Sequence, residues 1–306
     1  MKESKRPTAR PPASARSAFI AISLFGFGAI AVCGADSAGR VIVVTSTIQA
    51  AVDAAHPGDT IVVRPGTYHE SVRVEKDDIT IRGSHAAVVD ARGFSTGIRV
   101  GKPGGFPFPV VNGVPVCPQT ADPSRVVKGF TVDGLTIKNA RFAGVLLIGV
   151  NGYRLTKGRY VDNPEYGPFP ICSRNGRIDL NIVRGGNPEG TGPGMDAGIY
   201  VGDSDVVTVS QNLVTNYAIG IEIENSTHAI VEENFLTGNT TGILAVVLPG
   251  LPITTTADVR IVGNQVIHNN LPNPVSAGGD DVVGLLPTGT GILNVGGDRV
   301  LIRKTA

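Results

Sequence analysis

Two glutamates separated by one residue, Glu222 and Glu224, have the types and spacing best suited to chemistry. They alternate with Ile221 and Ile223, so on a β-strand both carboxylates would point to the same face, roughly 7 Å apart. Two carboxylates in a partly apolar groove can divide the roles of acid and base. The pair could instead supply oxygen ligands to Ca²⁺. A third interpretation is a polar pair on an exterior strand that only keeps the surface soluble.

The element that must position this pair is a repeat of 22 residues. Gly198, Gly220 and Gly242 each begin a segment with isoleucine in second place, and they follow one another at intervals of 22. A second series of asparagines runs in phase with them: Asn181, Asn212, Asn234 and Asn264. One such turn cannot bury its apolar face, but stacked turns bury a continuous column. The sequence therefore predicts an all-β fold, a single-stranded right-handed parallel β-helix with three sheets.

Each coil is expected to contain three short strands, as in residues 206–209, 212–214 and 220–223, because apolar residues alternate there with period two. The asparagine at each matched corner should tolerate a left-handed backbone and bond to its counterpart one coil away. The glycine that begins the third strand should serve the same backbone purpose without a Cβ.

Stacking the coils places Tyr200 and Leu244 on either side of Glu222, and Gly202 and Val246 beside Glu224. Outward-facing Leu244, Val246 and Leu293 are unusual for a bare face, so a loop, a partner or a sugar ring is expected to cover it. Asp196, Asp203 and Asp205 lie near the ends of the adjacent coil. The predicted catalytic residues are Glu222, Glu224 and Asp196. The predicted substrate-binding residues are Tyr200, Leu244, Asp203 and Asp205.

Residues 1–35 are predicted to be a signal peptide, because a basic segment precedes a short apolar stretch and small residues. Acylation of Cys33, as in a lipoprotein, and a retained anchor are the alternatives. Residues 36–306 would form the β-helix domain, with no membrane span after cleavage. The expected location is secreted, periplasmic or at the cell surface.

Two cysteines, Cys117 and Cys172, remain after the predicted cleavage. Their separation of 55 residues lies between two and three coils, so they could be close together on stacked turns. In an oxidising compartment they could form a disulfide. Two unpaired buried thiols are the alternative, and the sequence does not decide between them.

The two ends of the solenoid look different. Residues 47–55 should form a short amphipathic helix that caps the N-terminal coil, followed by a turn, the first strand at 60–63 and another turn at 65–68. The last residues stop in mid-repeat, and we expect a truncated C-terminus whose open coil frays or pairs with another chain. The oligomeric state is left open. Gly- and Pro-rich insertions are expected at 101–124, 153–171, 186–197, 249–256 and 271–288.

Several classes of function are disfavoured. Charged residues make up only 17% of the chain, and the basic excess lies in residues 1–35, so no nucleic-acid partner is expected. The histidines show no ligand spacing for a transition metal. Asp280 and Asp281 faintly resemble the paired aspartates of polygalacturonases, but the accompanying motifs of that group are missing.

Three N-terminal segments, residues 47–51, 57–61 and 65–68, resemble the first coil of pectin-lyase-like β-helix proteins. Three later segments, residues 196–202, 220–226 and 241–252, resemble bacterial exported parallel β-helix repeat proteins. The resemblance covers nearly all of 41–303 and implies the fold. It does not select a reaction, because this fold hosts lyases, hydrolases, esterases, epimerases, a copper-loading accessory protein and adhesins.

The prediction for function is recognition of polysaccharide by an exported β-helix. One alternative is a carbohydrate-active enzyme of the lyase, hydrolase or epimerase type, acting through Glu222, Glu224 and Asp196. The other is a non-catalytic surface protein that binds glycan or protein through its loops. Whether the chain is an enzyme is left open. No cofactor is predicted with certainty, and Ca²⁺ remains an alternative.

Overall fold

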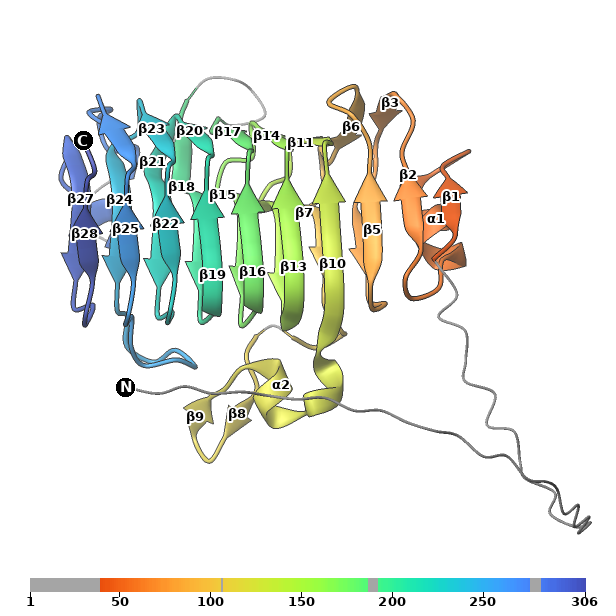
Figure 1. The fold of residues 1–306 in the computed structure, drawn as a ribbon, viewed down its shortest axis with the longest axis horizontal. Helices are drawn as coiled ribbons and strands as arrows, with labels where there is room; N and C mark the ends of the chain where they lie inside the picture. The colour runs from red at the N-terminus through yellow and green to blue at the C-terminus, as the bar shows by residue number, and fades with distance from the viewer. Residues whose placement is uncertain (1–38, 106, 187–191, 276–281) are drawn as a thin grey trace, which may run out of the picture. The chain divides into compact units, whose positions relative to one another are not determined.

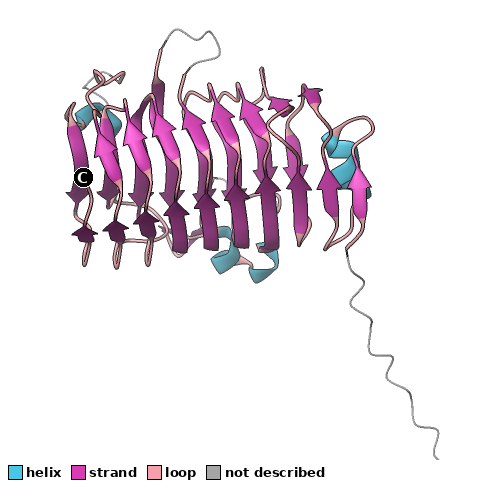
Figure 2. Ribbon diagram, turned by 45° about the horizontal axis from the view of Figure 1, so that its top comes forward, coloured by secondary structure: helices cyan, strands magenta, loops and turns pink. Residues whose placement is uncertain are grey.

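A computed structural model describes residues 39–105, 107–186, 192–275 and 282–306. The predicted signal peptide, Cys33 and the pair Asp280 and Asp281 lie outside the described residues. The described chain winds into three parallel sheets, so the predicted right-handed parallel β-helix is confirmed (Figure 1). Strands account for most of the regular structure, as Figure 2 shows.

Sheet A is the longest of the three and contains, in spatial order, β1 (Val41–Val43), β2 (Thr60–Val62), β5 (Ile79–Arg82), β10 (Val127–Asp133), β13 (Val150–Thr156), β16 (Arg174–Asp179), β19 (Asp205–Ser210), β22 (Ile230–Glu232), β25 (Arg260–Val262) and β28 (Leu301–Arg303). Sheet B contains β3 (Gly66–Tyr68), β6 (Ala87–Asp90), β11 (Thr136–Lys138), β14 (Arg159–Val161), β17 (Ile182–Arg184), β20 (Leu213–Thr215), β23 (Phe235–Thr237) and β26 (Gln265–Ile267).

Sheet C contains β4 (Val72–Val74), β7 (Thr96–Val100), β12 (Ala143–Ile148), β15 (Tyr166–Ile171), β18 (Gly194–Gly202), β21 (Tyr217–Glu224), β24 (Thr241–Val246) and β27 (Thr290–Val295). Side chains of like type stack inside the solenoid. Ile199, Ile221 and Ile243 pair in register across sheet C and are fully buried. Such columns supply the continuous apolar core that a single coil could not bury.

The asparagine ladder is confirmed, but the backbone predicted for it is wrong. Asn234 Oδ1 accepts hydrogen bonds from the backbone N–H and the Nδ2 of Asn212, at 3.0 and 2.9 Å. The left-handed residue at this corner is the one before each asparagine, such as Gln211 and Glu233, with φ of 56° and 55°. The asparagine itself turns inward, where its amide satisfies backbone groups that the corner leaves without strand partners.

The backbone predicted for the strand-initiating glycines is also wrong. Gly220 does not have a left-handed backbone. Its lack of a side chain matters for space instead, because a Cβ there would lie 2.6 Å from the carbonyl oxygen of Gly242 and 2.6 Å from Leu236 Cδ2. Glycine therefore lets consecutive coils approach each other within sheet C, where β21 faces Leu236 of sheet B across the interior.

Replacing Gly220 with alanine is expected to lower the free energy of unfolding by about 1–3 kcal/mol, because the added methyl group must displace backbone of the next coil. Gly192→Ala is the matched control, since a Cβ there has no atom within 4 Å. Urea unfolding followed by circular dichroism measures both variants. Equal stability of the two variants would contradict the close contact between consecutive coils at Gly220.

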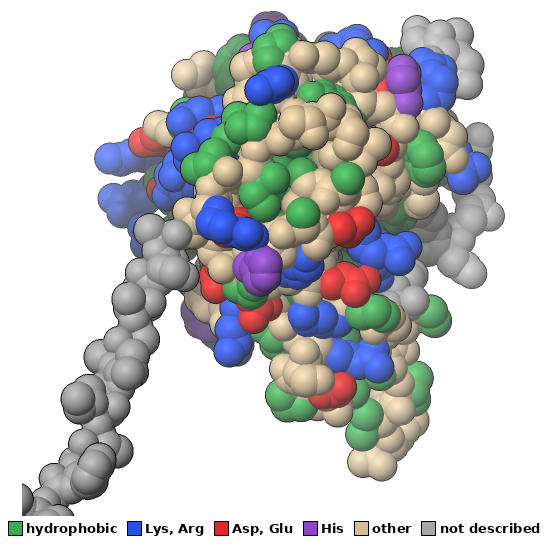
Figure 3. Space-filling view, turned by 90° about the vertical axis from the view of Figure 1, so that its right-hand side faces the viewer, with side chains coloured by type: hydrophobic (Ala, Val, Ile, Leu, Met, Phe, Trp, Pro, Cys, Tyr) green, Lys and Arg blue, Asp and Glu red, His purple; other side chains and the backbone are tan. Residues whose placement is uncertain are grey.

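The N-terminal helix is confirmed as α1 (Ile48–Ala54), and it covers the first coil. Thr47 Oγ1 accepts from the N–H of Ala50 at 3.1 Å, and the Glu70 carboxylate accepts from those of Ile48 and Gln49. These bonds satisfy the free amides of the first helical turn. Figure 3 shows that this end of the molecule carries charged side chains of both signs among apolar ones, so it is not a bare apolar edge.

Three details of the predicted element order are corrected. Strand β1 precedes the helix, whereas the first strand was expected at 60–63. The expected turn at 65–68 contains strand β3, which pairs with β6. The expected insertion at 153–171 is a regular coil formed by β13, β14 and β15. Two of its prolines, Pro168 and Pro170, lie within strand β15, and this disguised the repeat.

The insertion at 101–124 is real. It contains the hairpin of β8 (Val110–Val111) and β9 (Val114–Pro115), helix α2 (Pro118–Ala121) and the start of a 3₁₀ turn, η1 (Pro123–Arg125). Figure 1 shows β8, β9 and α2 together to one side of the strands. A second 3₁₀ turn, η2 (Val282–Leu285), lies in the insertion before β27.

Candidate carbohydrate site on sheet C

The outer face of sheet C brings the predicted residues into one row. Tyr200 and Leu244 pair with Glu222 from the two neighbouring strands, and Gly202 and Val246 pair with Glu224. The register expected from the repeat is therefore confirmed. The same row continues toward the N-terminal coils through Phe169 on β15, whose ring lies 4.3 Å from that of Tyr200.

The glutamates do not lie on an open surface. Glu222 is 2% exposed and Glu224 is 7% exposed, so the interpretation as an exterior pair that keeps the strand soluble is wrong. Leu244 and Val246 belong to an apolar cluster that includes Val283 and Leu286 from the insertion before β27. A segment of the chain therefore covers part of this face. The outward orientation of the apolar residues Leu244 and Val246 had predicted such a cover.

Two tyrosines bind carboxylates on this face. The Tyr200 hydroxyl donates to Glu224 Oε1 at 2.5 Å, and the Tyr166 hydroxyl donates to Asp196 Oδ2 at 2.5 Å. Burial, together with the nearby carboxylates, raises the pKa of both tyrosines above the usual value. Both hydroxyls therefore stay protonated at neutral pH. Tyr166 and Asp196 are only partly buried, so this pair is more accessible than Glu222 and Glu224.

Asp203 has a structural partner. Its Oδ1 accepts from the backbone N–H of Ile253 at 2.8 Å, which ties the loop after β24 to the corner between sheets C and A. The side chain is buried, and Oδ2 has no hydrogen-bond partner. Burial, reinforced by the charge of Glu224, raises the pKa of Asp203 to about 7. Asp203 is thus a carboxyl group that changes charge near neutrality.

Asp205 does not join the other predicted residues. It begins β19 in sheet A, and its Oδ1 accepts from Thr227 Oγ1 at 2.7 Å and lies 2.8 Å from His228 Nδ1. These contacts stabilise the neighbouring coil on the side of sheet A. The repeat placed Asp203 and Asp205 near the same coil end, but the corner between them separates their side chains.

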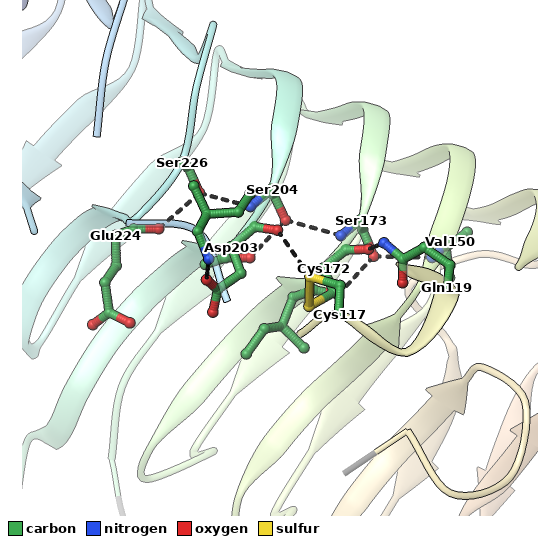
Figure 4. The surroundings of a disulfide bond; sticks show 12 residues. Cys117, Gln119, Val150, Cys172, Ser173, Asp203, Ser204, Glu224 and Ser226 are labelled. Carbon is green, nitrogen blue, oxygen red and sulfur yellow. Dashed lines mark hydrogen bonds between the residues drawn. A yellow bond between two sulfur atoms is a disulfide. The ribbon is translucent and has the colours of Figure 1, made fainter. Parts of the chain in front are cut away.

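Cys117 and Cys172 form a disulfide, with their Cα atoms 5.5 Å apart (Figure 4). Cys172 directly follows β15, and the side-chain amide of Gln119 donates to its carbonyl oxygen at 2.6 Å. Cys117 Sγ lies 3.8 Å from the carbonyl oxygen of Asp203. The disulfide and these contacts fix the insertion against the corner of the solenoid, next to the outer face of sheet C.

A groove on the first coils of sheet C was missed in the sequence. Its cavity volume is about 1060 Å³. Polar and charged side chains that line it include Arg73, Arg99, Lys76, Ser95 and Thr96. Apolar side chains that line it include Phe94, Phe142, Leu146, Ile148, Phe169 and Ile171. The advance signal was the segment Gly97-Ile98-Arg99, which has the Gly-Ile pattern of the later coils and puts Arg99 at the position that Tyr200 and Glu222 take there.

The groove and the carboxylate cluster share an aromatic wall. Phe142 and Phe169 line the groove, with ring centroids 5.4 Å apart. Tyr166 packs against both rings, at 5.2 Å from Phe142 and 4.4 Å from Phe169. The tyrosines that bind Asp196 and Glu224 therefore also hold the rings that a ligand in the groove would contact.

Within the described ranges, no group of three or more His, Cys, Asp or Glu side chains could hold a metal ion. The same part of the chain contains no helix that is long and apolar enough to cross a membrane.

Comparison with solved structures shows that the chain has the right-handed parallel β-helix fold that they share. A mutant of DFA-IIIase from Arthrobacter chlorophenolicus A6 in complex with DFA-III is similar over 76% of this chain and 65% of its own, with 12% identity and a TM-score of 0.52. The chain therefore spans less than two thirds of that protein. The A-module of the mannuronan C-5 epimerase AlgE6 from Azotobacter vinelandii is similar over 84% of this chain and 70% of its own, with 14% identity and a TM-score of 0.52.

An alginate lyase from Paenibacillus sp. str. FPU-7 aligns with 87% of this chain and 98% of its own, at 17% identity and a TM-score of 0.48. Residues 127–276 match the family described as periplasmic copper-binding protein (NosD). No curated protein matches the chain. At these identities the structural likeness establishes the fold.

The copper named in that family description does not fit the described residues. Both cysteines in this part of the chain are joined in a disulfide, which removes their thiolates as ligands. Met195 is 47% exposed, and among the described residues no group of three or more His, Cys, Asp or Glu side chains could bind a metal ion with it. The outer face of sheet C presents carboxylates, tyrosines, arginines and aromatic rings.

Proposed function

We propose that this protein recognises polysaccharide and that the groove on the first coils of sheet C is the binding site. The observation that carries the proposal is the groove itself, a cavity of about 1060 Å³ lined by both aromatic side chains and polar or charged groups. Binding sites of about 300–1,000 Å³ that combine apolar walls with a few polar groups accommodate ligands larger than one sugar ring. Aromatic rings offer flat apolar faces against which a sugar ring can pack.

The similar structures support the carbohydrate class without fixing the ligand. One was solved with DFA-III, and another is named as an epimerase of mannuronan. We also propose a location outside the cytoplasm, with residues 1–35 as the signal peptide. The family described as periplasmic and the Cys117–Cys172 disulfide both favour this location, since disulfides persist in oxidising compartments.

Catalysis is the second candidate function, and the accessible Tyr166–Asp196 pair favours it. Asp196 was predicted as catalytic, and its partner Tyr166 contacts the aromatic wall of the groove. A protonated tyrosine and a carboxylate can act as acid and base in a lyase, hydrolase or epimerase. Glu222 and Glu224 are too well covered to meet a chain in the groove, so they would act only through Tyr200.

Replacing Phe94 with alanine is expected to weaken polysaccharide binding about tenfold, since the loss of one aromatic contact costs roughly 1.4 kcal/mol. Phe94 lines the groove and is 43% exposed, so its loss should leave the core intact. Affinity electrophoresis in gels with a panel of neutral and acidic polysaccharides measures the change. Val110→Ala is the control, because Val110 is 64% exposed on the β8–β9 hairpin.

The same panel tests the proposal as a whole. Retardation of the folded wild-type chain by none of the polysaccharides would contradict polysaccharide recognition. Retardation that Phe94→Ala leaves unchanged would place the site elsewhere on the protein. Release of reducing or unsaturated ends that stops in Asp196→Asn, while binding persists, would establish the enzyme instead of the simple binder.

A further inference from the structure

We propose that Arg73 and Arg99 form an anion subsite in the groove, and hence that the polysaccharide carries carboxylate or sulfate groups. This inference rests on the proposed function and names the ligand class for the same site. It concerns two side chains on strands β4 and β7, in the row of sheet C that continues through Leu146 to Phe169.

The register of the first coils places these two arginines side by side. Arg73 on β4 pairs with Arg99 on β7, and both line the groove. Neighbouring strands lie about 4.8 Å apart, so the two side chains leave the same face of the sheet from adjacent positions. Like charges in this arrangement repel each other and destabilise a sheet. A bound anion would remove that repulsion.

Another pair of arginines in register on adjacent strands, Arg154 and Arg177, shows the contrast, because one carboxylate binds both. Arg154 and Arg177 both bind Asp179, and Arg184 binds Asp162 on the neighbouring coil. Within the described chain, no ion pair within 4.0 Å involves Arg73 or Arg99. Both guanidinium groups therefore keep their donors for a ligand.

The surroundings hold Arg73 and Arg99 in place without neutralising them. The backbone N–H and carbonyl of Arg73 bond to the side-chain amide of Gln49 on α1, at 2.6 and 3.2 Å. Arg99 is half-buried, and burial together with the charge of Arg73 lowers the pKa of its guanidinium. Glu75 also lines the groove and favours the charged form of Arg99, though it makes no close ion pair with it. Burial and the charge of Arg73 both disfavour the charged form of Arg99, so a bound anion would stabilise that form.

A neighbouring lysine, Lys76, adds a basic side chain to the same groove. Lys76 lines the groove, and its Nζ donates to the carbonyl oxygens of Val52, Asp53 and Ala55 at the end of α1. Those carbonyls are neutral groups, so none of these three bonds pairs the ammonium with an anion. Asp53 and Glu75 are the carboxylates that also line the groove.

Guanidinium groups match the geometry of carboxylate and sulfate, because their N–H donors form a planar fork that binds two oxygens at once. Phe94 lies on the same groove, so a sugar ring packed against the phenyl group could direct an acidic substituent toward the arginines. Carboxylate on a uronic acid and sulfate on a sulfated glycan share this chemistry. The experiment must separate these two sources.

The test compares the full-length wild-type chain with Arg73→Gln and Arg99→Gln. Calorimetric titration with polygalacturonate, dextran sulfate and neutral dextran measures affinity at low and high salt. We expect each substitution to weaken binding of the acidic polymers tenfold or more, since a hydrogen bond to a charged group contributes about 1.5–3 kcal/mol. Binding of neutral dextran should change less than twofold. The tighter of the two acidic polymers identifies the source of the anion.

Two further variants keep the test decisive. Arg174→Gln removes an exposed arginine from β16 in sheet A, and it should bind the acidic polymers like the wild type. Arg99→Lys keeps the charge but loses the fork, so it should retain binding that is weaker than wild type. Thermal melts establish that each variant is folded.

The possible results are distinct. Binding of neutral dextran as tightly as the acidic polymers would overturn the anion subsite and leave the proposed function standing. Equal losses in Arg174→Gln and Arg99→Gln would also overturn it. Binding of single-stranded DNA with the same arginine dependence would assign the groove to phosphate polymers and overturn the inference. No binding of any polysaccharide by the wild type would contradict the proposed function itself.

Discussion

Replacing Asn234 with alanine is expected to lower the free energy of unfolding by about 4 kcal/mol, because several buried polar groups lose their partners together. Asn234 Oδ1 accepts from two nitrogens of Asn212. Its Nδ2 donates to the Val209 carbonyl and to Asn264 Oδ1, both at 2.9 Å. Alanine removes all four bonds at a position that is 1% exposed. Water cannot easily replace them there.

Urea unfolding of Asn234→Ala measures this loss, and Gln211→Asn is the control. Gln211 occupies the same corner with an exposed side chain, and asparagine tolerates its left-handed backbone. The control should change stability by less than about 0.5 kcal/mol. A loss in Asn234→Ala no larger than in the control would mean that the ladder does not hold neighbouring coils together.

Replacing Asp203 with asparagine is expected to stabilise the protein at pH 8 by about 2 kcal/mol. Folding raises the pKa of Asp203 to about 7, and a rise of one in a pKa corresponds to about 1.4 kcal/mol. The expected gain of about 2 kcal/mol is smaller than the whole rise would imply, because one polar atom of the asparagine amide stays buried without a hydrogen-bond partner, as Oδ2 does now. Asparagine keeps an oxygen for the N–H of Ile253 and suits the left-handed φ of 45° at this corner.

The pH dependence fixes the sign of this prediction. A carboxyl group whose pKa is raised by folding costs nothing below its unfolded pKa near 4, because it is protonated in both states. The cost grows as pH rises from about 4 to 7 and stays constant above 7.

Thermal melts of the wild type and Asp203→Asn at pH 4, 5, 6, 7 and 8 test this dependence. The gain in Tm should be small at pH 4, increase up to pH 7 and then level off. Glu224 is the charged group that reinforces the rise in the pKa of Asp203. Glu224→Gln should therefore narrow the difference between the two proteins at pH 8. A gain in Tm that shrinks as pH rises would contradict the assignment.

The regular coils were predictable because their length is constant and side chains alternate with period two. Once Gly198, Gly220 and Gly242 are aligned, Tyr200 and Leu244 must lie beside Glu222, as they do. The sequence predicted that something covers the face of Glu222 and Glu224, but it did not predict which segment. The cover includes Val283 and Leu286, which lie far along the chain within an insertion whose path no repeat predicts.

The Tyr–carboxylate bonds were not predictable from the alignment. Tyr200 pairs in register with Glu222, but its hydroxyl reaches Glu224, two residues further along the next strand. A long side chain can reach such a diagonal neighbour, and the backbone register does not say whether it will. The rotamer that decides this depends on packing against Phe169.

The groove escaped the sequence for a different reason. Strand β4 with Arg73 lacks the Gly-Ile pattern, whereas Gly97 and Ile98 on β7 have it. The insertion at 101–124 interrupts the spacing before the next copy, so the register that joins Arg99 to Leu146 appears only when Gly97 is aligned with Gly144 across the insertion. The coil at 153–171 was missed similarly, because Gly167 is followed by proline instead of isoleucine.

The most direct test of the account is hydroxyl-radical footprinting of the protein with and without the polysaccharide that it binds most tightly. This method reports the solvent exposure of individual side chains. We expect oxidation of Phe94 and Phe142 in the groove to fall on binding, while Met195, at 47% exposure, and Val110 stay unchanged. Protection of Met195 and Leu285 with unchanged Phe94 would contradict the account, because the ligand would then lie over the covered carboxylates and not in the groove.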